Sequence, residues 1–139
     1  METLTNNSTQ TMVDKIETLS STICHNESYM ADATASLEAA KLAVLDLKHE
    51  IEVCEIEITN LAINLPDYAT LKNEGARKQF IDSYLLKKAS ETNIYSEKLS
   101  LVPQTNLAVT KITTDIAKMK ADISHNKRLI DLYMVMLAK

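Results

Sequence analysis

The stretch 44-VLDLKHEIEVCEIEITNL-61 decides the fold, because its apolar residues recur with the period of a coiled coil. Two positions of a seven-residue repeat are apolar, namely Val44, Ile51 and Ile58 at the first and Leu47, Cys54 and Leu61 at the second. This spacing places the apolar side chains on one face of a helix, where a second helix can cover them. The stretch therefore predicts a long helix that pairs along one seam.

The same repeat continues outward in both directions. It extends back to Ile16 and forward to Leu65, and Pro66 then prevents the helix from continuing. A second set of apolar residues, again seven apart, begins at Tyr95 and reaches Leu137, with Pro103 inside it. We expect a disordered tail over 1–10 and a single domain over 11–139. Within that domain we expect a long helix over about 11–65, a connector helix over about 67–89, and a long helix over about 91–138 with a break or kink near Pro103.

Composition and charge favour pairing of the two long helices within the chain. The 139 residues include one glycine, two prolines and no tryptophan, which is typical of a protein that is almost entirely helical. Residues 12–65 carry a net charge of −7 and residues 91–139 a net charge of +2. Opposite charges favour antiparallel contact. We predict an all-α fold, an antiparallel helical hairpin (coiled coil) of two long helices with a short connecting helix.

The seven-residue repeat places the cysteines, the histidines and two asparagines either on the seam or away from it. Cys54 falls on the seam and Cys24 away from it. The three histidines, His25, His49 and His125, also lie off the seam, and none has a ligand four residues away, so we expect no metal and no cofactor. Asn26 and Asn126 occupy seam positions, where they either fix the register or mark a frayed, hydrated end of the coil.

Three groups of residues are candidates for binding. An acidic series is either a solvated face or a surface for a basic partner. A polar set in the connector either contacts a partner protein or phosphate, or includes Arg77 as an internal tie to Glu55, Glu57 or Asp67. The last eleven residues are apolar almost all round, which favours self-association as a homodimer over contact with a different partner or packing against the N-terminal arm. The members are Glu50, Glu52, Glu55 and Glu57 for the acidic series, Lys72, Asn73, Arg77 and Lys78 for the connector, and Leu129, Leu132, Tyr133 and Met136 for self-association.

The connector also carries a resemblance. Tyr68 and the pattern Lys72-Asn73-x-x-x-Arg77-Lys78, set between two long heptad helices, resemble small coiled-coil accessory proteins of bacteriophages and prophages. The resemblance covers about 30 residues, and what it implies is a mobile-element origin and an accessory role. Pro103 and the threonine-rich stretch 110-TKITTD-115 depart from the pattern.

No motif indicates an enzyme, since there is neither a glycine-rich phosphate loop nor a nucleophile elbow. The longest uncharged apolar run, 132-LYMVMLA-138, is too short to cross a membrane, and we expect a cytoplasmic protein. We predict a non-enzymatic accessory protein that binds and inhibits or redirects a larger host nucleic-acid-processing or defence complex, in the manner of an anti-CRISPR or other anti-defence protein. The alternatives are an accessory protein of phage recombination or replication that contacts nucleic acid, and a structural spacer.

Overall fold

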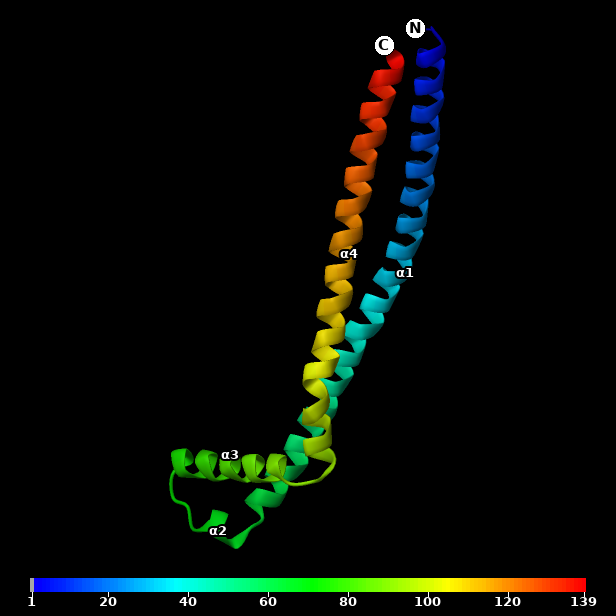
Figure 1. Ribbon diagram of the computed structural model, residues 1–139. Coiled ribbons are helices and arrows are strands. Elements are labelled where there is room, and N and C mark those ends of the chain that lie inside the picture. Colours follow the sequence, from blue (N-terminus) through cyan, green and yellow to red (C-terminus); the bar gives the residue numbers. More distant parts are fainter. Residues whose placement is uncertain (1) are drawn as a thin grey trace. The chain divides into compact units, whose positions relative to one another are not determined.

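The computed structural model describes the backbone of residues 2–139 and the side chains from Asn7 onward. Within this range every regular element is a helix, as the heptad repeats predicted. The four helices, coloured along the chain in Figure 1, are α1 (Glu2–Ile63), α2 (Pro66–Ala69), α3 (Glu74–Ser90) and α4 (Ile94–Ala138). None of the described helices is long and apolar enough to cross a membrane.

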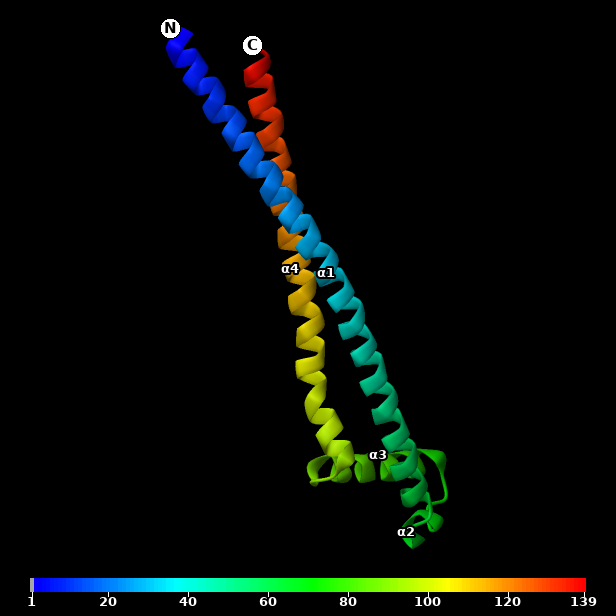
Figure 2. The same cartoon turned by 90° about the vertical axis from the view of Figure 1, so that its right-hand side faces the viewer.

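The helices form two units, and each long helix contributes a segment to both. The first unit combines the α1 residues up to Glu38 with Thr110–Lys139, and the second is Ala39–Val109. Within each unit the segments of α1 and α4 lie side by side and run antiparallel, as both views show (Figures 1 and 2). In the first unit Lys127 Nζ lies 3.6 Å from Glu27 Oε1. In the second unit Lys98 Nζ lies 2.8 Å from Glu50 Oε2. The predicted antiparallel pairing is therefore confirmed.

The first unit is a seam between two helices. Ile23 of α1 and Ile116 and Ile123 of α4 are its buried residues, and all three fall on the predicted repeat. Asn26 and Asn126 are half-buried, which agrees with their seam positions. Each buried isoleucine keeps 7–8% of its surface exposed.

The second unit has a larger core because α3 adds a third helix. Leu47, Ile51 and Ile58 of α1 meet Tyr95 at the start of α4, and all four are buried. Tyr84, Leu85 and Ala89 of α3 pack against this cluster, together with Cys54, Leu99 and Val102. Cys54 is a half-buried core residue, while Cys24 is exposed.

The connector contains two helices where the sequence predicted one. Thr70 closes α2, since its hydroxyl donates to the carbonyl of Asp67 at 2.7 Å. Asn73 then begins α3 from an extended conformation, and its side-chain oxygen accepts a hydrogen bond from the Ala76 amide at 2.7 Å. Asparagine is among the strongest residues at this capping position. Gly75 therefore lies in the first turn of α3 and not in a helix interior.

The long helices also differ from the prediction at their N-termini. Residues 2–10, predicted as part of a disordered tail, are helical, and Thr11 Oγ1 donates to the Asn7 carbonyl at 2.9 Å. This segment is helical because helix formation is cooperative: extending an existing helix costs far less free energy than starting one. Neither glycine nor proline interrupts the segment. The part of the predicted tail at Met1 lies outside the described residues. Helix α4 begins at Ile94 and continues through Pro103, so of the predicted break or kink the structure shows no break.

Candidate functional site

The outer face of α1 in the second unit carries a second apolar repeat. Its members, which we call the outer stripe, are Leu42, Leu45, Val53, Ile56 and Ile63, with exposed fractions of 58%, 62%, 40%, 62% and 41%. Leu42, Ile56 and Ile63 are separated by multiples of seven residues. At 100° per residue this stripe lies on the side of α1 opposite the buried Leu47 and Ile51. Helix α1 is therefore apolar on two faces here, and only one of them is covered.

Charged and titratable residues accompany the outer stripe. His49 lies within it, seven residues from both Leu42 and Ile56, and is exposed. Lys48 and Glu55 lie along one edge, and Glu50 and Glu57 along the other. An apolar strip between charged edges is the pattern of a helix that packs against another helix.

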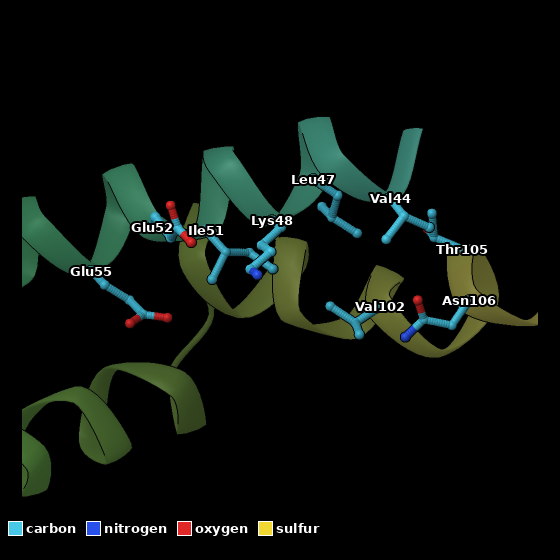
Figure 3. Close-up of a pocket in the computed structure, with 9 residues that line it drawn as sticks. All are labelled: Val44, Leu47, Lys48, Ile51, Glu52, Glu55, Val102, Thr105 and Asn106. Atoms are coloured by element: carbon cyan, nitrogen blue, oxygen red, sulfur yellow. The ribbon is translucent and has the colours of Figure 1, made fainter. Parts of the chain in front are cut away.

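A groove adjoins the outer stripe on the side of Lys48 and Glu55. Its volume is about 400 Å³. Figure 3 shows an apolar floor contributed by both long helices and a polar rim around it. The floor consists of Val44, Leu47, Ile51 and Val102, and the rim of Lys48, Glu52, Glu55, Thr105 and Asn106.

The predicted acidic surface is not one face. Glu50 and Glu57 lie on one side of the buried seam and Glu52 and Glu55 on the other, because alternate residues of a helix point about 200° apart. Glu50 is paired with Lys98 at 2.8 Å, and this hydrogen bond raises the pKa of Lys98. Burial raises the pKa of Tyr95, and the neighbouring Glu55 carboxylate adds to that effect. Two of the four glutamates thus interact within the chain.

The connector residues have structural roles that account for part of the predicted cluster. Asn73 caps α3, and the Arg77 Nε donates to the carbonyl of Leu71 at 3.2 Å. Arg77 therefore ties the loop before α3 to its first turn, in place of the predicted ion pair with the acidic arm. Lys72 and Lys78 are exposed on the same part of the chain. The structure does not bring the four together around a common ligand position.

The predicted self-association residues at the end of α4 divide into two pairs. Leu129 and Tyr133 line a groove facing α1 together with Lys15, whose Nζ lies 5.5 Å from the Tyr133 ring centroid. Leu132 and Met136 point outward, with exposed fractions of 54% and 45%. Only the second pair is open to another molecule.

Sequence reasoning missed two features of the second unit. One is the outer stripe, whose signal was a second seven-residue repeat inside the first.

The other is the junction of α3 and α4, where Asn93 Oδ1 accepts from the Ser96 amide at 2.8 Å and Asn93 Nδ2 donates to the Lys88 carbonyl at 2.9 Å. The Ser96 hydroxyl and the Asn93 amide complete a reciprocal cap at 3.0 Å. The pattern Asn-x-x-Ser before an apolar repeat is the corresponding sequence signal.

Among the side chains described from Asn7 onward, no group of three or more histidine, cysteine, aspartate or glutamate residues converges as metal ligands would. His25, His49 and His125 are all exposed, as predicted. No family model, no curated protein and no solved structure matches the chain.

Proposed function

We propose that this protein is a non-catalytic helical binding protein that packs the outer stripe of α1 against a helix of another protein molecule. The exposure of five large apolar side chains on one face carries the proposal. Burying a leucine, isoleucine or valine side chain contributes about 1.5–3 kcal/mol. A partner that removes these side chains from water would gain part of this free energy on binding.

The groove beside the stripe supports binding of a helix over binding of a small metabolite. Its floor is apolar, and charged and polar side chains from both long helices surround it (Figure 3). Small-molecule sites are usually enclosed and carry a few polar groups that converge on the ligand. A neighbouring helix instead inserts a row of apolar side chains and places its own charged residues along the rim.

An accessory role in a bacteriophage is the setting that the connector implies, with a larger host complex as the target. The division of the glutamates favours an apolar contact over imitation of nucleic acid, because no single face presents all four carboxylates. The exposed pair Leu132 and Met136 offers a second apolar contact in the other unit. A direct contact of Lys72 and Lys78 with nucleic acid is less favoured, because the chain carries a net charge of −4.

The test compares two substitutions of equal exposure. Ile56→Glu places a charge in the outer stripe, whereas Leu107→Glu places one on α4 at a residue that is 63% exposed and outside the stripe. Each tagged variant is used to recover proteins from a bacterial lysate treated with nuclease, and circular dichroism confirms that both remain helical. We expect Ile56→Glu to lose the bound protein and Leu107→Glu to keep it. Equal recovery by the two variants contradicts the proposal.

A further inference from the structure

We infer that the helix bound by the outer stripe is basic as well as apolar, with lysine or arginine residues flanking the apolar row that meets Val53, Ile56 and Ile63. This inference rests on the proposed function, since it names the chemistry of the partner of the same surface. Three observations support it: carboxylates line both edges of the stripe here, no cation of the chain neutralises them, and an apolar hollow adjoins each edge.

Carboxylates lie on both edges of the outer stripe in its second half. Residues 49–63 of α1 contain four glutamates and neither lysine nor arginine. At 100° per residue, Glu52 lies about 40° from Ile56 on one edge, and Glu57 lies about 100° from Ile56 on the other. Glu55 lies on the same edge as Glu52. A helix that covers Ile56 therefore places its flanking residues next to carboxylates on either side.

The chain itself leaves three of these carboxylates without a cation. Glu50 is paired with Lys98 at 2.8 Å. Glu52, Glu55 and Glu57 take part in none of the ion pairs in the described part of the chain. Cations on a partner would be attracted to these carboxylates, whereas an acidic partner would be repelled by them. The charge of the two edges thus selects a basic helix over an acidic one.

An apolar hollow adjoins each edge. The groove of about 400 Å³ in Figure 3 lies beside Glu52 and Glu55. A second hollow, of about 480 Å³, lies beside Glu57, between α1 and the junction of α3 and α4. Leu61 and Ile94 line this hollow and keep 58% and 66% of their surfaces exposed. The second half of the stripe is therefore a ridge between two partly apolar surfaces.

Apolar surface beside a carboxylate suits the side chains of lysine and arginine. Their carbon stems pack along apolar surface while the charged head stays at its edge, where it can pair with a carboxylate. Lys88 of this chain also lines the second hollow, but Glu91 already pairs with it at 3.3 Å. A purely apolar helix would cover the stripe and leave both edges unpaired.

The first half of the stripe sets the direction of the partner helix. Leu42 and Leu45 have charged neighbours of both signs, including Asp46 and Lys48, so this half does not select cations. The partner should therefore carry its lysine and arginine residues toward the end that covers Ile63.

The experiment measures the binding of two fluorescent synthetic peptides to the purified full chain by fluorescence anisotropy. Both peptides are helices of about four turns with leucines at the spacing of the outer stripe. One carries lysine at the flanking positions, and the other carries glutamate at the same positions. We expect the lysine peptide to bind and the glutamate peptide not to bind. Ile56→Asn should weaken binding of the lysine peptide by at least about 10-fold, whereas Leu107→Asn should not.

Charge variants of the chain test the two edges. Glu52→Gln combined with Glu57→Gln should weaken binding of the lysine peptide by about 10-fold, since two surface ion pairs are lost. The matched control combines Glu17→Gln with Glu97→Gln, which alters the net charge equally at exposed positions outside the stripe. This control should leave binding unchanged. Equal weakening by the two double variants, equal binding of the two peptides, or no binding of the lysine peptide overturns the inference.

The recovery of proteins from a lysate separates this inference from the proposed function. If the recovered protein is lost with Ile56→Glu and kept with the Glu52→Gln and Glu57→Gln double variant, the binding role stands and the basic partner is overturned. If both variants keep the recovered protein, both proposals fail. Loss with both variants and retention by the Glu17→Gln and Glu97→Gln control supports both.

Discussion

The junction of α3 and α4 allows a stability prediction with separable parts. Asn93→Ala removes the side-chain oxygen that caps α4 and the amide that donates to the Lys88 carbonyl at the end of α3. Loss of an asparagine cap costs about 1 kcal/mol. Loss of one partly buried hydrogen bond costs about 1 kcal/mol more. We therefore expect the free energy of unfolding to fall by about 2 kcal/mol.

Two further variants assign the cost to its sources. Asn93→Asp keeps the capping oxygen and loses the donor to Lys88, so it should cost about 1 kcal/mol. Asn73→Ala removes the cap of α3 alone, where the side chain makes a single hydrogen bond to Ala76, and should also cost about 1 kcal/mol. The assay is urea unfolding followed by circular dichroism, with all variants at one protein concentration so that association is held constant.

The ranking of the variants carries the test. If Asn93→Ala costs no more than Asn73→Ala, the bond between the two helices contributes nothing and the argument from geometry is wrong. If Asn93→Asp costs as much as Asn93→Ala, the capping oxygen has no role. An unchanged urea dependence across the series shows that the same unfolding transition is compared.

Three other predictions concern packing, backbone freedom and pH. Gly75→Ala should stabilise the protein by about 0.4–1 kcal/mol, since the added methyl group meets only Asn73 Oδ1 at 3.4 Å and the unfolded chain loses freedom; a loss of stability in urea unfolding contradicts this. Ile51→Ala should lower stability by about 2–4 kcal/mol and Ile56→Ala by far less in dilute monomer, because only the first is buried; equal losses refute the assignment of faces. The raised pKa of Tyr95, caused by burial and then by a carboxylate, favours its neutral form in the folded state. The contribution of neutral Tyr95 to the free energy of unfolding is therefore complete below the ordinary pKa of tyrosine, and it is lost as pH rises through the raised pKa. The alkaline loss of stability should be smaller in Tyr95→Phe.

Periodicity allowed the long helices and their pairing to be predicted, because a seven-residue repeat marks the face of a helix that a second helix covers. Leu47, Ile51 and Ile58 are buried where the repeat placed them, whereas Leu61, at the end of the same stretch, keeps 58% of its surface exposed. Boundaries were less accurate. The polar segment 7–10 has the composition of a tail, yet it is helical because it continues a helix already formed.

The candidate site was harder to predict because polar residues near helix ends have two uses. Asn73 and Arg77 resemble ligand-binding residues, but the backbone at the start of α3 engages both of them. The outer stripe was missed for a different reason. Val53 and Ile56 lie between seam residues, so in a linear sequence they add to one apolar run, and only their exposed fractions separate two faces.

The division of the chain between the two units determines the order in which contacts become available during synthesis. The second unit is the continuous segment Ala39–Val109, so all of its partners have been made before residue 110. The first unit joins the earliest part of α1 to Thr110–Lys139, and its α1 segment must wait for more than half of the chain to emerge from the ribosome. Once the second unit has formed, the chain between the two segments of the first unit is already closed, so their contacts cost less entropy. The pairing of α1 with α4 should then begin near Tyr95 and extend toward the two chain ends. Slow codons between 39 and 109 would therefore affect folding yield more than slow codons near either end.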